Sequence, residues 1–82
     1  MLEAKIYIML KGTIADPQGA AVKHALESLH YDEVQDVRVG KLITLKIKSN
    51  DKKRTGERVD KMCKKLFANP IIEDYAYEIE KI

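Results

Sequence analysis

Few side chains in this sequence combine the residue types and spacing that catalysis or metal binding requires. His24 and His30 have no cysteine nearby and lack the H-x-x-E/H spacing of metal ligands on a helix, so we expect both to be solvated surface residues. Cys63 lies among apolar residues at helical spacing, which predicts a buried, unreactive thiol. Because the carboxylates are scattered over different elements, no paired acid and base is predicted. We therefore expect no catalytic residue, no metal site and no cofactor bound by this chain.

The glycines do not form a phosphate-binding loop, since neither G-x-x-x-x-G-K-[S/T] nor G-x-G-x-x-G occurs. One of them belongs to a more informative run, Asp16-Pro17-Gln18-Gly19. Asp16 can cap the free N–H groups of a helix, and Pro17 suits its first position. Gly19 in the first turn suggests a close backbone approach. The run could present N–H groups to an anion or to a partner protein, or it could be a simple cap, and both interpretations stay open.

Length and charge indicate one small domain, residues 1–82, that meets a partner. A core of this size supplies only about 3–5 kcal/mol, and such chains often form oligomers. The apolar runs are too short for a bilayer span, no signal peptide is recognisable, and a single cysteine fits a reducing compartment, so a cytoplasmic protein is expected. Lys46–Lys65 holds nine basic and three acidic residues, which predicts a solvated helix face; nucleic-acid binding through this segment stays an alternative.

The periodicity of the apolar residues predicts two helices and four strands. Residues 3–11 and 71–79 alternate as strands do, and 17–30 and 59–67 have helical spacing. Residues 37–39 and 43–47 are two shorter strands. If these two share a core face, the turn between them must hold an odd number of residues, which predicts a three-residue hairpin, Gly40-Lys41-Leu42.

The order βαββαβ predicts an α+β fold, a ferredoxin-like sandwich. Its antiparallel sheet would have the order 4-1-3-2, with both helices on one face. The other face would expose Tyr7 and Met9 at its apolar centre, which we interpret as a surface for self-association.

The fold alone does not decide the function, so we compared the chain with functions that this fold supports. An RNA-recognition motif requires aromatic residues on the strand at 43–47, which has none. A metallochaperone requires Cys-x-x-Cys, and an acylphosphatase requires an arginine within residues 11–18; both are absent. Two hypotheses remain from the residues themselves. One is a non-catalytic assembly module, and the other is an ACT-like regulatory dimer that binds a small molecule.

Several short runs, in order along nearly the whole chain, resemble one protein family. They are Asp16-Pro17-Gln18-Gly19, Ala21-Val22, His24-Ala25-Leu26, Glu33-Val34-Gln35-Asp36-Val37-Arg38, Gly40-Lys41, Cys63, Leu66, Ala68-Asn69-Pro70 and Ile72-Glu73-Asp74-Tyr75. Together they resemble the PurS family, the small subunits of phosphoribosylformylglycinamidine synthase in purine biosynthesis. The segment Asn50–Arg58 departs from the family pattern because it is more basic.

The resemblance implies a subunit of a glutamine-dependent C–N ligase complex that uses ATP, Mg and glutamine. Such a subunit forms a homodimer or higher homo-oligomer. It bridges a PurL-type synthetase and a PurQ-type glutaminase, so that ammonia reaches formylglycinamide ribonucleotide. No nucleic-acid or membrane partner is implied. The matched segments place partner contacts at Asp16, Pro17, Gln18, Gly19, Asp36, Arg38, Gly40 and Lys41, and the contact between copies at Tyr7 and Met9.

Overall fold

Three antiparallel strands form the sheet of this protein, whose computed structural model describes residues 1–82. β1 (Leu2–Leu10) lies between β2 (Gly40–Ile47) and β3 (Glu73–Lys81). Ile6 pairs with Ile43 on one side and with Tyr77 on the other, so alternate apolar residues of all three strands share a face. The three longer predicted strands are confirmed, with 43–47 and 71–79 on either side of 3–11 as expected.

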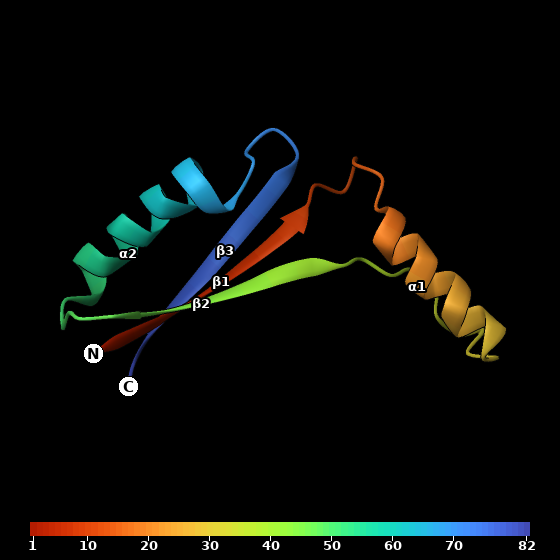
Figure 1. The fold of residues 1–82 in the computed structure, drawn as a ribbon, viewed down its shortest axis with the longest axis horizontal. Coiled ribbons are helices and arrows are strands. Elements are labelled where there is room, and N and C mark those ends of the chain that lie inside the picture. The colour runs from red at the N-terminus through yellow and green to blue at the C-terminus, as the bar shows by residue number, and fades with distance from the viewer.

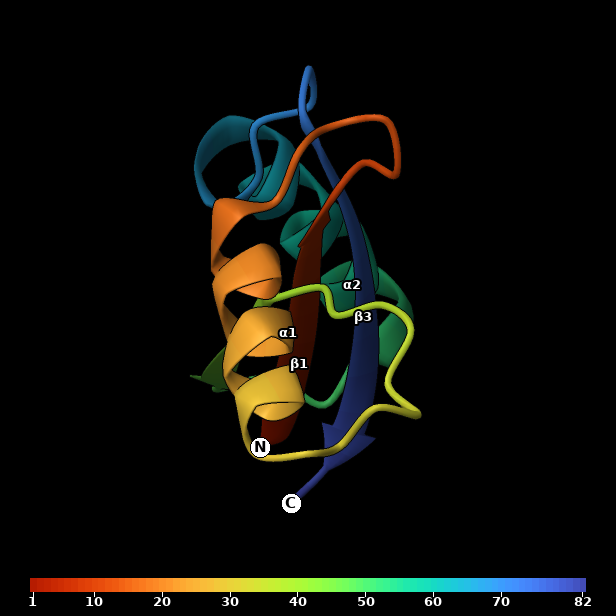
Figure 2. The same cartoon turned by 90° about the vertical axis from the view of Figure 1, so that its right-hand side faces the viewer.

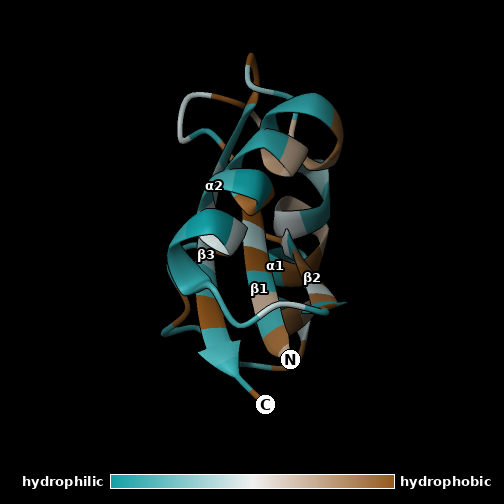
Figure 3. Cartoon of the chain, turned by 90° about the vertical axis from the view of Figure 1, so that its left-hand side faces the viewer, coloured by the Kyte–Doolittle hydropathy of each residue, from teal (hydrophilic) through white to brown (hydrophobic).

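One helix covers the apolar face of the sheet. α2 (Lys52–Met62) continues into a π-helical turn, η1 (Cys63–Phe67), and both lie along the strands (Figures 1 and 3). Thr55, Val59 and Cys63 are buried at intervals of four residues, so they form one stripe against the sheet. The Asp51 carboxylate accepts a hydrogen bond from the Arg54 N–H at 3.1 Å and caps α2, a cap that the sequence analysis did not find.

The predicted strand at 37–39 and the hairpin at Gly40-Lys41-Leu42 are both wrong for the single chain. β2 begins at Gly40, which pairs with Met9, and Leu42 pairs with Tyr7. Residues 37–39 form no strand. The physical reason is that 40–47 is one unbroken strand along β1, which leaves no residues for a turn. The outer edge of β2 is unpaired, and the sheet has three strands in the order β2-β1-β3 instead of four in the order 4-1-3-2.

α1 (Pro17–Ser28) is the expected helix, but it does not lie on the sheet with α2. It projects beyond the end of β1, and the chain returns beside it to β2 (Figures 1 and 2). Gly19 is its one buried residue, while Val22 on the helix and Leu29 at its C-terminal cap are 43% and 65% exposed. The radius of gyration is 16.1 Å, whereas a compact domain of this length has about 12 Å. We call residues 17–36, helix and returning chain, the arm.

Neither helix has the length and apolar character needed to cross a bilayer.

Candidate partner-binding site

Two connections meet at the base of the arm, and Asp16 joins them. Its Oδ1 accepts a hydrogen bond from the Gly19 N–H at 2.9 Å and so caps α1. Its Oδ2 accepts one from the Val39 N–H at 2.7 Å, on the chain that returns to the sheet. One carboxylate therefore fixes both chain segments at the base of the arm.

Arg38 closes the other side of the same junction. Its Nη2 donates hydrogen bonds to the carbonyl oxygens of Lys11 and Ile14, each at 3.0 Å. The side chain thus ties the returning chain to the loop that follows β1. The hydrogen bonds from Gly19 and Val39, together with the nearby Arg38 guanidinium, lower the pKa of Asp16 below its ordinary 3.8.

Two glycines allow the backbones at the junction to approach closely. A Cβ added at Gly19 would lie 2.2 Å from the Val37 carbonyl oxygen, and one added at Gly40 would lie 2.7 Å from the Ile8 carbonyl oxygen. The close approach expected at Gly19 is confirmed. These two positions require glycine because any side chain would push neighbouring backbones apart.

The edge of the junction carries charged and polar groups that a partner could contact. Gln18, Gly40 and Lys41 line a cavity of about 220 Å³ beside Glu73, whose Oε2 lies 3.7 Å from the Lys41 Nζ. Lys11 Nζ pairs with Asp74 Oδ1 at 2.7 Å on the same side. This surface joins the ends of β1, β2 and β3 to the start of α1.

The structure thus brings most of the sequence-predicted partner residues to one place. Asp16, Pro17, Gln18, Gly19, Arg38, Gly40 and Lys41 all lie at this junction. Asp36 is exposed on the returning chain and takes no part in the hydrogen bonds there.

Tyr7 and Met9 lie on the opposite face of the sheet, each 39% exposed. Tyr7 has Leu42 and Ala76 as its cross-strand neighbours. Leu42, 57% exposed, is part of this apolar patch but was assigned to a turn in the sequence analysis. Its alternation with Thr44 and Lys46 was the signal that could have placed it there.

The pKa of Asp16 leads to a prediction for acid stability. Because folding lowers this pKa, ionised Asp16 stabilises the native state above about pH 4, and the stabilisation is lost as the pH falls through the lowered value. In Asp16→Asn, the amide oxygen can still cap Gly19 but cannot also accept from Val39. We expect this variant to be less stable at pH 7 and to lose less stability than the wild type between pH 5 and pH 2, in urea titrations.

The remaining groups with shifted pKa values also have structural roles. The Tyr75 hydroxyl donates a hydrogen bond to Asp60 Oδ1 at 2.7 Å, which raises the pKa of Tyr75 to about 12 and lowers that of Asp60. Burial raises the pKa of the Cys63 thiol, so the thiol stays protonated, as expected. His24 and His30 are exposed. No group of His, Cys, Asp or Glu side chains is placed to hold a metal ion.

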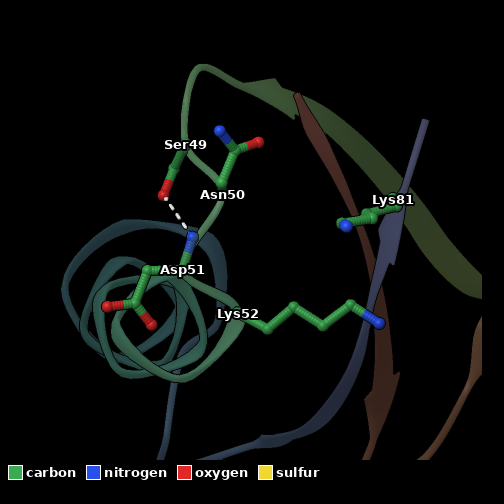
Figure 4. Close-up of a pocket in the computed structure, with 5 residues that line it drawn as sticks. All are labelled: Ser49, Asn50, Asp51, Lys52 and Lys81. Atoms are coloured by element: carbon green, nitrogen blue, oxygen red, sulfur yellow. Dashed lines mark hydrogen bonds between the residues drawn. The ribbon is translucent and has the colours of Figure 1, made fainter.

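A wide, open hollow at the start of α2 is lined entirely by polar and charged residues. Figure 4 shows Lys52 and Lys81 beside it, with the Asp51 carboxylate turned away from both ammonium groups. The Asp51 N–H donates to Ser49 Oγ at 3.1 Å, so the loop satisfies its own polar groups. We therefore assign no ligand to this hollow.

Every titratable group with a shifted pKa serves a structural bond or is a buried thiol, and the most elaborate hydrogen bonding holds an arm in place. These features define a small α+β protein in which a polar junction holds a projecting helical arm. A family model described as PurS, phosphoribosylformylglycinamidine (FGAM) synthase, matches residues 3–81. The chain belongs to the PurS family of phosphoribosylformylglycinamidine synthase subunits, as its resemblance predicted.

Individual relatives match over nearly their full length. Phosphoribosylformylglycinamidine synthase subunit PurS of Bacillus subtilis is 50% identical over 82 residues, which cover 100% of this chain and 96% of that protein. The crystal structure of PurS from Methanocaldococcus jannaschii has a TM-score of 0.90 at 38% identity, with 100% and 99% of the two chains covered. A chain in the structure of PurLQS from Thermotoga maritima has a TM-score of 0.85 at 26% identity, with 98% and 99% covered.

Proposed function

We propose that this chain is the non-catalytic assembly subunit of its synthase and bridges a PurL-type synthetase and a PurQ-type glutaminase. The projecting arm is the observation that carries the proposal, because a helix with an uncovered apolar side requires a partner to bury it. A neighbour of the same fold lies in a structure named PurLQS, which supports these two partners. ATP, Mg and glutamine are then used by the larger subunits, and the role of this chain is to hold those two subunits in position relative to each other.

Self-association is the second part of the proposal. The single chain has a three-stranded sheet covered by α2, while α1 and the segment 37–39 lie beyond the sheet. A ferredoxin-like sandwich requires a fourth strand and a second helix on the same face. In a homodimer, α1 of one copy would cover the part of its partner's sheet beside α2, and 37–39 would add a fourth strand to the open edge of β2. The sheet order would then be 4-1-3-2, completed between two chains.

The junction residues have a specific part in this function. Asp16, Arg38 and Gly19 fix the direction of the arm, while Pro17, Gln18, Asp36, Gly40 and Lys41 present the surface around its base to the larger subunits. The apolar patch of Tyr7, Met9 and Leu42 provides a further contact between copies, in an assembly larger than a dimer. The free, buried Cys63 agrees with a cytoplasmic location.

Reconstitution of the synthase tests the function. We expect the mixture of synthetase and glutaminase subunits to use ammonia equally well with and without this chain, and to use glutamine only when the chain is present. The fully buried core variant Ile6→Ala serves as the negative control. A glutamine-dependent rate that is the same without the chain, together with no binding to either larger subunit, would refute the proposal.

A further inference from the structure

A groove of about 450 Å³ lies between the end of β2 and one side of α2. Lys48, Arg54 and Arg58 line it, with the apolar Ile47 and Met62. None of these three cations forms an ion pair, because the chain's four salt bridges lie elsewhere. The one carboxylate at the groove, Asp51, is bonded to the Arg54 N–H as the cap of α2. The groove is therefore a polar, positively charged surface with two apolar residues in its lining.

The end of the arm has the opposite charge. Asp32 and Glu33 lie four and five residues after the end of α1, and both are exposed and without an ion pair. Beside them, Leu29 and Tyr31 are 65% and 51% exposed. The arm thus ends in two carboxylates next to two large uncovered apolar side chains, which complements the groove in both charge and hydrophobicity.

The two surfaces cannot meet within one chain. The arm ends at one end of the molecule and α2 begins at the other, along a longest dimension of 48 Å (Figure 1). The junction at Asp16 and Arg38 holds the arm in this direction. A contact between the two surfaces therefore requires a second copy of the chain.

We propose that the groove of each copy binds the acidic end of its partner's arm, with Asp32 and Glu33 facing Lys48, Arg54 and Arg58. This inference rests on the homodimer proposed above and names the surfaces that hold it. The two-fold symmetry of such a dimer would repeat the contact, since each copy supplies one groove and one arm.

The topology supports this placement. A helix that lies back over a sheet after β1 runs antiparallel to β1, so it ends near the start of β1, where Leu2 pairs with Ile47. The twelve residues of α1 span about 18 Å, and the residues after it extend the reach along most of the roughly 26 Å of β2. The end of the arm would then lie beside Ile47 and Lys48, at the mouth of the groove.

Charge reversal on each side separately gives a sharp test. One variant, Arg54→Glu with Arg58→Glu, makes the groove acidic, and the other, Asp32→Lys with Glu33→Lys, makes the arm basic. We expect each variant alone to dimerise at least tenfold more weakly than the wild type, by light scattering and analytical ultracentrifugation. An equal mixture of the two should dimerise again, because both contacts in the mixed dimer join opposite charges. Lys53→Glu with Lys65→Glu, exposed cations outside the groove, is the matched control and should dimerise normally.

The outcomes separate this inference from the function it rests on. If both variants dimerise like the wild type, or if the mixture is no better than either alone, the groove–arm contact is wrong while the assembly function stands. A groove variant that dimerises normally but no longer binds a larger subunit would assign the groove to that subunit and also overturn the inference. A wild-type chain that is monomeric at high concentration would instead refute the proposed homodimer.

Discussion

Replacing Gly19 with alanine is expected to destabilise this protein, although alanine favours helices by about 1 kcal/mol over glycine. Gly19 lies in the first turn of α1, and its added Cβ would be 2.2 Å from the Val37 carbonyl oxygen. That oxygen belongs to a backbone held by Arg38 and Val39, so it cannot move without breaking the hydrogen bonds of the junction. We expect a loss of about 1–3 kcal/mol, a fall in melting temperature of roughly 5–20 °C.

Gly12→Ala is the matched control, because no atom lies within 4 Å of the Cβ that it adds. This variant should change stability by less than about 0.5 kcal/mol. Melting curves at one fixed chain concentration compare the two, since self-association makes the melting temperature depend on concentration. A Gly19→Ala protein that melts above the wild type would show that helix propensity outweighs the close approach, and that the junction is not rigid.

Replacing Ile6 with alanine should have the largest effect of any single substitution considered. Ile6 is fully buried at the centre of β1, between Ile43 and Tyr77 and beneath α2. Removing its buried methyl groups costs about 2–5 kcal/mol, which equals the total stability that a domain of this size draws from its core. The variant should therefore be mostly unfolded at room temperature in circular dichroism and urea titration.

Ile71→Ala removes the same atoms from a side chain that is 80% exposed. Its stability should match the wild type within about 0.5 kcal/mol. If Ile6→Ala unfolded within 1 kcal/mol of this control, the sheet would not be the main source of stability in the single chain.

Local patterns in the sequence predicted the helices and strands well where the structure of a residue depends mainly on residues close to it in the chain. The alternation at Ile6 and Ile8 and the helical spacing of Val59 and Cys63 both reflect burial against the same sheet face, and both were confirmed. The Asp16 cap and the close approach at Gly19 were also predicted, because capping and glycine requirements depend on a few adjacent residues.

The position of α1 could not be predicted in the same way. Apolar residues such as Val22 and Leu29 require burial, but their spacing does not say whether the covering surface belongs to the same chain or to another. The same holds for Val37 and Val39, whose alternation fits a strand yet has no partner within the single chain. The prediction assumed that one chain completes its own sandwich, and this assumption produced the wrong hairpin.

The site was predicted in part for a related reason. The run from Asp16 to Gly19 marked the start of α1, but nothing in the sequence indicated that Asp16 also accepts a hydrogen bond from Val39, twenty-three residues away. Every residue except proline has a backbone N–H, so residue type does not show which N–H will donate to a distant side chain. Leu42 was missed because a turn was assigned to it.

The open edge of β2 exposes copies of this chain that have not yet bound a partner to aggregation. An unpaired strand rich in Leu and Ile can recruit other strands and grow into fibrils. Lys41 and Lys46 lie on this strand, and stacking identical edges in register would bring like charges together at both positions. The two lysines therefore oppose fibril growth by copies of the chain whose β2 edge is still open.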